Sequence, residues 1–256
     1  MNYFHSIILG AVEGITEFLP ISSTGHLILT SHLLGLSQTE FIKTFEIAIQ
    51  LGAIWAVVVL YWKSLFTNFK VIQRIAAAFV PTAILGLIFY KFIKSILFNS
   101  QQVVLWSLLV GGIILIVFEL LYKEKEDAGA EIGDISFKKA FMIGVFQSLA
   151  MVPGVSRSAA TIIGGLLLGL KRKTIVEFSF LLAVPTMLAA AVLDLSKNVA
   201  SFSGDQFFFL AVGFVVSFIV ATLSIKFFLY FIKNHNFIGF GIYRVLVALL
   251  FWFAVR

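Results

Sequence analysis

Long apolar runs, separated by short polar stretches, set the organisation of this chain. Runs at about 44–62, 75–98 and 101–122 are each near the roughly 20 residues that a helix needs to cross a bilayer. Three similar runs follow at about 174–195, 207–232 and 237–256. The pattern therefore predicts six transmembrane helices.

Two further apolar stretches are interrupted partway by polar residues. Residues 3–20 end at Pro20, just before a Ser-Ser-Thr-Gly run, and residues 22–35 can form only a short second helix. Residues 140–170 have the same form, with a break between Pro153 and Ser158. Two short helices joined by a polar break predict a re-entrant hairpin at each place.

The two halves of the chain repeat each other at a fixed offset. Placing Gly10-Ala-Val-Glu over Gly144-Val-Phe-Gln brings Ser22-Ser-Thr onto Ser156-Arg-Ser, an offset of 134 residues without a gap. The polar connection at 123–139 divides one membrane domain, residues 1–256, into repeat halves 1–125 and 134–256. Each half crosses the membrane an odd number of times, so the second must be inverted. The expected fold class is an all-α polytopic membrane protein, with six transmembrane helices and two re-entrant helical hairpins in an inverted-topology repeat.

The composition supports lipid as the solvent of this chain. Its residues are 60% hydrophobic and 12% charged, and the mean hydropathy is +1.04, too apolar for a water-soluble core. No cysteine is present, which excludes disulfides and thiolate metal sites and leaves oxygen and imidazole ligands. The 29 phenylalanines are interpreted as lipid-facing bulk. The net charge of +6 bears on topology and does not indicate a nucleic-acid partner.

Lysine and arginine positions predict the orientation. Assigned to the two sides of the membrane by the predicted spans, twelve of them fall on the side that holds the 123–139 loop and five on the other, with Arg157 and Arg244 left inside a hairpin and a span. By the positive-inside rule the richer side is cytoplasmic, and both termini face outward. The first hairpin then enters from outside, so the cleft is expected to open to the outer face.

The two polar breaks are predicted to meet near the bilayer midplane, because irregular backbone is tolerated there only when it is buried in protein or lines a wet cavity. Each break is followed by a helix that begins with hydroxyl residues, so backbone N–H groups and helix dipoles converge on an anion such as phosphate. The predicted phosphate ligands are Ser22, Thr24, Ser156, Ser158, Thr161 and Gln147. The alternative for Ser22, Thr24, Ser156 and Ser158 is simple helix capping. Thr161 and Gln147 lie one to two turns from the break, so they are expected to support the direct ligands from behind.

Charged residues within the hairpins point to chemistry, because each costs roughly 2.5–3.5 kcal/mol at bilayer depth. Glu13 and Glu17 are four residues apart on one helix face, where they repel unless a divalent cation, Mg²⁺ or Ca²⁺, lies between them. In the alternative, one carboxyl is protonated and the other pairs with Arg157. The guanidinium of Arg157 also matches phosphate oxygens.

Ser23 and His26 lie three apart on the second helix, close enough for the imidazole to act on the hydroxyl or on a leaving oxygen. The predicted catalytic residues are therefore Glu17, Ser23, His26 and Arg157, and the predicted metal ligands are Glu13 and Glu17. The attacking group stays open between Ser23, His26 and a metal-bound water. Arg244, in the last apolar run, is a candidate counter-charge to the site or to Asp194.

At these residues the chain resembles the undecaprenyl-diphosphate phosphatase family, the bacitracin-resistance proteins of bacterial inner membranes. Two motifs carry the resemblance, Glu13-Gly-Ile-Thr-Glu-Phe-Leu-Pro-Ile-Ser-Ser-Thr-Gly-His26 and Pro153-Gly-Val-Ser-Arg-Ser-Ala-Ala-Thr161, supported by 45–52 and 177–185. The resemblance implies removal of the terminal phosphate of undecaprenyl diphosphate, which returns the monophosphate carrier to peptidoglycan synthesis and confers resistance to bacitracin. It also implies a divalent cation and the same fold of six spans and two hairpins.

The competing class is a transporter, because inverted repeats with broken helices that meet at the midplane are common among carriers. A flippase for a lipid phosphate, or a carrier of a small anion, would use the same helix ends. A mere carrier has no need for Ser23 beside His26 or for a carboxylate pair. The sequence leaves open which cation is native, whether the protein forms a homodimer, and whether it also moves the lipid carrier.

Overall fold

The computed structural model describes residues 1–37, 39–92, 100–123, 131–198 and 204–254, with the backbone alone at 90–92, 193–198, 204, 205 and 254. Across these ranges the chain is helical and contains no strand. Five helices are long and apolar enough to cross a membrane, so the chain is a multi-pass membrane protein. The side chains of Lys91, Lys94, Lys125, Lys197 and Arg256, used in the charge count, lie outside the described part.

The helices that match predicted spans begin and end close to the expected positions. They are α3 (Glu40–Leu60), α5 (Phe69–Phe92), α6 (Gln101–Leu121), α9 (Arg172–Asn198), α10 (Gly204–Phe231) and α11 (Ile238–Ala254). The first five are the candidate spans, whereas α11 has 17 residues and is shorter. A short helix, α4 (Trp62–Phe66), which the pattern did not predict, follows α3. The described part of the 123–139 connection contains a 3₁₀ turn, Ile132–Asp134, and the start of the next helix at Phe137.

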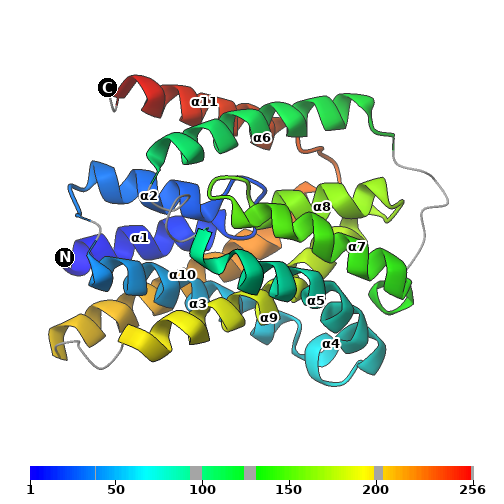
Figure 1. Ribbon diagram of the computed structural model, residues 1–256, viewed down its shortest axis with the longest axis horizontal. Coiled ribbons are helices and arrows are strands. Elements are labelled where there is room, and N and C mark those ends of the chain that lie inside the picture. Colours follow the sequence, from blue (N-terminus) through cyan, green and yellow to red (C-terminus); the bar gives the residue numbers. More distant parts are fainter. Residues whose placement is uncertain (38, 93–99, 124–130, 199–203, 255–256) are drawn as a thin grey trace.

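Two helical hairpins occupy the interior. The first consists of α1 (Tyr3–Thr16) and α2 (Ser23–Leu33), and the second of α7 (Phe137–Ser148) and α8 (Arg157–Leu167). Each helix of the second hairpin begins 134 residues after its counterpart in the first, as the sequence offset predicts. In Figure 1 the first hairpin fills the left half of the bundle and the second the right half, so their turns meet in the middle.

The hairpins are held by close helix contacts. The helix α1 packs along α10, and α7 packs along α5, so each hairpin lies against a long helix of the other half of the chain. A Cβ added at Gly10 would lie 2.6 Å from the carbonyl oxygen of Gly213, and one added at Gly144 would overlap the carbonyl of Ala78. Small residues at these contacts let the backbones approach, which is how helices associate where lipid gives no hydrophobic drive.

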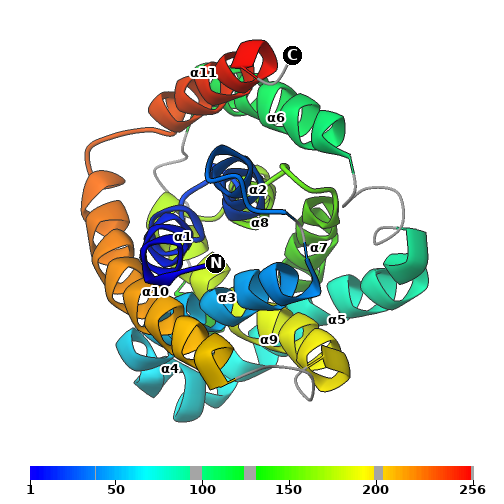
Figure 2. The ribbon, with the colours of Figure 1, turned by 90° about the vertical axis from the view of Figure 1, so that its left-hand side faces the viewer.

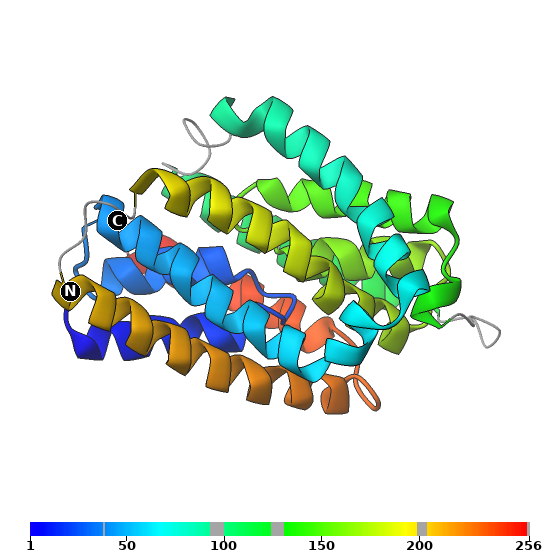
Figure 3. The same cartoon turned by 90° about the horizontal axis from the view of Figure 1, so that it is seen from below.

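Other helices surround the hairpins. Seen from the end, α2 and α8 lie near the centre, with the α6–α11 pair on one side and α10, α3 and α9 on the other (Figure 2). Figure 3 shows the long helices running in one general direction, with the start of α1 and the end of α11 at the same end. The surfaces of α6 and α11 expose large apolar side chains, including Leu120, Leu121, Leu250 and Phe253.

The interpretation of phenylalanine as lipid-facing bulk holds only in part. Phe207, Phe208, Phe227 and Phe253 are exposed. However, Phe18, Phe180 and Phe228 are fully buried and contact one another in that order, with ring centroids 5.3 Å apart in an edge-to-face pair and 6.1 Å apart in a tilted pair. Flat rings fill the spaces between crossing helices, and edge-to-face pairs stabilise that packing.

Candidate active site

Both hairpin turns end in a serine with unusual backbone geometry. Ser22 has φ 72° and Ser156 has φ 76°, and these are the positive φ values at non-glycine residues in the described chain. Each serine is the N-cap of the helix that follows, and its side chain accepts a hydrogen bond from the backbone N–H of Gly25 or Ala159. Such a conformation costs about 1–3 kcal/mol and persists where the surrounding structure imposes it, commonly at functional sites.

The two turns present unpaired backbone donors. The N–H groups of residues 22–24 and 156–158 have no hydrogen-bond partner among the described residues. Together with the positive ends of the α2 and α8 dipoles, they form two donor sets of the kind that binds phosphate. Capping and anion binding are therefore compatible at the same helix ends. The hydroxyls of Ser22 and Ser156 cap the helices, and the backbone N–H groups stay free. Thr24 is half-buried, and the hydroxyl of Ser158 bonds within the protein, to the carbonyl oxygen of Phe18.

Ser23, Glu17 and Arg157 form one hydrogen-bonded cluster. The hydroxyl of Ser23 donates to Oε2 of Glu17 at 2.5 Å, and Nη2 of Arg157 donates to Oε1 of the same carboxylate at 3.0 Å. Glu17 and Ser23 are each less than a tenth exposed. One carboxylate thus contacts both a potential nucleophile and the guanidinium from the opposite hairpin, and it is placed to accept the serine proton.

Arg157 is held in place by Ser179, which the sequence analysis did not single out. Its Nη1 donates to the carbonyl oxygen of Ser179 at 2.7 Å and to the hydroxyl of Ser179 at 3.2 Å, while Nε has no partner among the described residues. Ser179 lies on α9 and is fully buried. The hydroxyl of Thr161 lies 2.7 Å from that of Ser179. The predicted phosphate contact of Thr161 stays a prediction, and its position indicates an indirect role through Ser179.

Two more predicted phosphate ligands join helices within the protein. The hydroxyl of Ser158 donates to the carbonyl oxygen of Phe18 at 2.8 Å, which ties the second hairpin to the first turn. The amide of Gln147 donates to Thr82 on α5 at 2.8 Å and to Thr186 on α9 at 3.1 Å. Both contacts position the hairpins, and the oxygen of Gln147 has no partner in the described chain.

The predicted pairing of Ser23 with His26 is not present. The Nδ1 atom of His26 lies 2.8 Å from the carbonyl oxygen of Ser22, and Nε2 lies 2.9 Å from the hydroxyl of Tyr243 on α11. The rings of His26 and Tyr243 are stacked, 5.5 Å apart and 5° from parallel. Three-residue spacing on a helix brings side chains near each other, but here the cap carbonyl turns the imidazole away from Ser23. Sequence reasoning missed Tyr243, which no local motif marks.

The two carboxylates predicted to hold a cation, Glu13 and Glu17, have different surroundings. Both carboxylate oxygens of Glu13 are buried and lack a hydrogen-bond partner in the described part of the chain, whereas Glu17 pairs with Arg157. A buried carboxylate without a donor requires a proton or a cation. No group of three or more histidine or carboxylate side chains lies together among the described residues. The pairing of Glu17 with Arg157 is the one expected in the alternative without a metal, and Glu13 and Glu17 would be the oxygen donors toward a hard cation such as Mg²⁺ or Ca²⁺.

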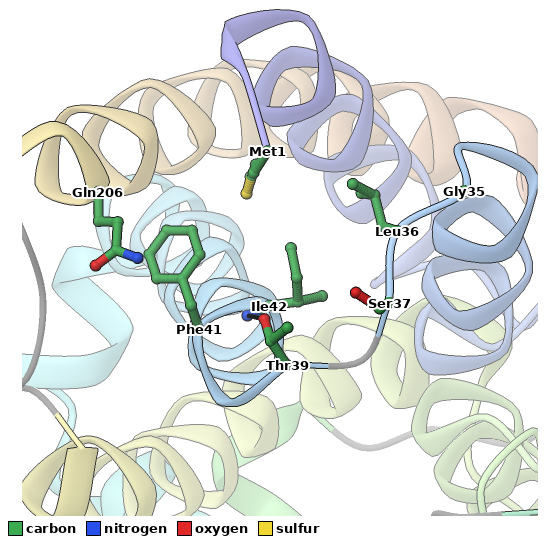
Figure 4. A pocket seen from close by; sticks show the side chains of 8 residues that line it. All are labelled: Met1, Gly35, Leu36, Ser37, Thr39, Phe41, Ile42 and Gln206. Carbon is green, nitrogen blue, oxygen red and sulfur yellow. Dashed lines mark hydrogen bonds between the residues drawn. The ribbon is translucent and has the colours of Figure 1, made fainter.

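The pocket in Figure 4 is separate from this cluster. It has a volume of about 350 Å³ and lies between the start of α1, the start of α3 and α10, with Met1, Leu36 and Phe41 among its lining residues. None of its lining residues carries a charged side chain. The chemistry of the chain is concentrated instead where the two hairpin turns meet.

These features define a class of protein, a multi-pass helical membrane protein in which two hairpin turns carry free N–H donors beside a buried cluster of Ser23, Glu17 and Arg157. Residues 6–250 match the model of the family described as bacitracin resistance protein BacA. Proteins named undecaprenyl-diphosphatase are similar over nearly the full length. That of Aquifex aeolicus is 53% identical over 251 residues, 98% of each chain, and that of Sulfurihydrogenibium sp. is 56% identical over 252 residues, 98% of this chain and 99% of its own. That of Wolinella succinogenes is 51% identical over 253 residues, 99% of this chain and 98% of its own.

The chain therefore belongs to the bacitracin resistance protein family. The resemblance inferred from the two hairpin motifs is confirmed.

Proposed function

We propose that this protein is an enzyme that hydrolyses undecaprenyl diphosphate to undecaprenyl phosphate and inorganic phosphate. The observation that carries the proposal is the hydroxyl of Ser23 hydrogen-bonded to Glu17, beside the guanidinium of Arg157 and at the start of one of the two helices whose first N–H groups are free. The names of its relatives state the same activity. In bacteria this reaction returns the lipid carrier to cell-wall synthesis and confers resistance to bacitracin.

In this proposal Ser23 attacks the terminal phosphorus while Oε2 of Glu17 accepts its proton. The bond from that phosphorus to the bridging oxygen breaks, and undecaprenyl phosphate leaves with the electron pair. Water then hydrolyses the phosphoserine, releases inorganic phosphate and restores the serine hydroxyl. The 2.5 Å contact supports Glu17 as the proton acceptor, and the engaged ring nitrogens of His26 argue against imidazole in that role.

The other site residues stabilise charge and hold position. Arg157 and the N–H groups of the two helix starts would face the equatorial oxygens, where charge is carried through phosphoryl transfer. Glu13 and Glu17 would hold a divalent cation, which supplies neutralisation of the diphosphate charge. The buried, unpaired carboxylate of Glu13 supports this assignment.

The proposed architecture has two inverted halves, 1–125 and 134–256, each with one re-entrant hairpin and three spans. It requires α11 to act as a sixth span, with its exposed apolar side chains facing lipid. The equal offset of the two hairpins supports the repeat. The protein would lie in the bacterial inner membrane.

The cleft is proposed to open to the outer face, from the distribution of lysine and arginine. A cysteine in place of Ala128, which lies outside the described residues, tests the orientation. An impermeant thiol reagent should leave the Ala128→Cys protein unlabelled in intact cells and label it after lysis. Labelling of intact cells would reverse the topology.

The activity is tested with purified protein in detergent. Parent and Ser23→Ala proteins are given undecaprenyl diphosphate, with added Mg²⁺ or Ca²⁺ or with a chelator, and phosphate release is measured. The proposal predicts release by the parent that stops on chelation. A folded parent that releases no phosphate under any of these conditions would refute it, and transport of an intact lipid phosphate or anion would then be the function to examine.

A further inference from the structure

Arg244 is the largest fully buried side chain described, and its partners are unusual. Nη1 donates to the carbonyl oxygens of Pro20 at 3.3 Å and Val155 at 3.1 Å, and Nη2 donates to those of Ser107 at 3.0 Å and Gly154 at 2.9 Å. Among the described side chains no carboxylate pairs with it; the side chain of Asp194, one predicted partner, lies outside them. A buried charge is costly unless its environment compensates it, and here four backbone dipoles do so.

Three of the four carbonyls belong to the two turns that must meet for the site to exist. Pro20 belongs to the first hairpin turn, Gly154 and Val155 belong to the second, and Ser107 lies on α6. Arg244 itself lies on α11, outside both hairpins. One guanidinium therefore joins both turns, and no other described side chain bonds to the backbone of both.

The contact also orients peptide groups. A trans peptide is planar, so its carbonyl and its N–H point in opposite directions. Because the carbonyl of Val155 points at Arg244, the N–H of Ser156 in the same peptide points away from it, and that N–H is one of the free donors of the second turn. Arg244 thus lies behind the donor set, on the side opposite the anion.

We propose that Arg244 is a positioning residue that fixes the two anion-binding helix ends relative to each other, so that both donor sets face one phosphoryl group. The inference rests on the proposed function and deepens it. Arg244 has no exposed surface and acts through the backbone of the turns. Its loss should therefore reduce turnover by misplacing groups that do touch substrate.

Gly111 on α6 offers a way to move the guanidinium while keeping its charge. The three nearest atoms to a Cβ added there all belong to Arg244, and the Cζ atom would be only 2.8 Å away. Gly239, on the same helix as Arg244, has nothing within 4 Å of an added Cβ. Gly111→Ala is therefore the displacing variant, and Gly239→Ala is a matched control.

The experiment compares the parent with Arg244→Lys, Gly111→Ala and Gly239→Ala. Thermal unfolding first sets an assay temperature at which each protein is folded, and then kcat, KM and the binding of orthovanadate are measured. A misplacement near 1 Å can cost about 100-fold, so Arg244→Lys and Gly111→Ala should lose about that factor in kcat and bind orthovanadate at least about tenfold more weakly. Gly239→Ala should stay within about twofold of the parent, because its Cβ meets nothing.

Parental kcat and orthovanadate binding in a folded Gly111→Ala protein would overturn the proposal, whatever Arg244→Lys does. If Arg244→Lys fails to fold, Gly111→Ala alone decides the question. A parent without phosphatase activity would remove the proposed function, whereas orthovanadate binding by the same proteins would still test the role of Arg244.

Discussion

Replacing Arg157 with lysine separates the charge of this residue from its geometry. The guanidinium donates twice to Ser179 through Nη1, at 2.7 and 3.2 Å, and twice to Glu17 through Nη2, at 3.0 Å to Oε1 and 3.4 Å to the backbone carbonyl oxygen. A lysine ammonium is a single point of charge on a flexible stem and cannot reproduce a planar fork that joins α9 to α1. The substitution therefore keeps the positive charge but loses at least two of these contacts.

The expected loss follows from those contacts. Hydrogen bonds to charged groups contribute about 1.5–3 kcal/mol each, so losing two removes roughly 4 kcal/mol of positioning and charge stabilisation. At about 1.4 kcal/mol for each factor of ten, Arg157→Lys should lower turnover by about 10³-fold. The loss is expected mainly in kcat, because Arg157 is proposed to stabilise the charge carried through phosphoryl transfer.

The assay is phosphate release from undecaprenyl diphosphate, with thermal unfolding as a check on folding. Arg74→Lys is the matched control, because Arg74 bonds the carbonyl oxygen of Ile135 and lies over the ring of Phe137, at the start of α7. It should keep activity within about twofold, as a substitution remote from the site. An Arg157→Lys protein within about tenfold of the parent would refute the reasoning, since the fork would then contribute no more than ~1.4 kcal/mol.

Four further substitutions test other parts of the site. Glu17→Gln should abolish cation-dependent turnover with the fold intact, and unchanged activity with unchanged dependence on Mg²⁺ or Ca²⁺ would disprove ligation there. Ser23→Ala should lower phosphate release by more than about 10³-fold, whereas a loss within about tenfold would shift the attack to water or His26. Tyr243→Phe keeps the ring stacked on His26 but removes one hydrogen bond, so kcat should fall about five- to tenfold, and a kcat equal to that of the parent would make the contact incidental. Gly144→Ala should lower the unfolding temperature, because overpacking a close helix contact costs about 1–3 kcal/mol; an unchanged value would show that α5 and α7 adjust freely.

Much of the fold follows from local properties of the sequence. Apolar runs of membrane length, the breaks at Pro20 and Pro153 and the serine caps after them determine where helices begin and end, because these are interactions within a few residues. The offset between Ser22 and Ser156 can be found for the same reason, since it links two short stretches of similar residues. The family could also be recognised from the sequence, because its two motifs are contiguous stretches around those breaks.

The tertiary structure decided which polar side chains meet. Spacing along one helix predicted that Ser23 pairs with His26. In the structure, the packing of α11 places Tyr243 against the imidazole, and the hydroxyl of Ser23 donates to the carboxylate of Glu17. Arg244 was a candidate counter-charge to the site or to Asp194, and only the packing of α11 and α6 over both turns shows that it donates to backbone carbonyls. Contacts across more than 200 residues depend on how helices cross, and crossing is set by small residues such as Gly10 and Gly144, whose neighbours lie on other helices and leave no local pattern in the sequence.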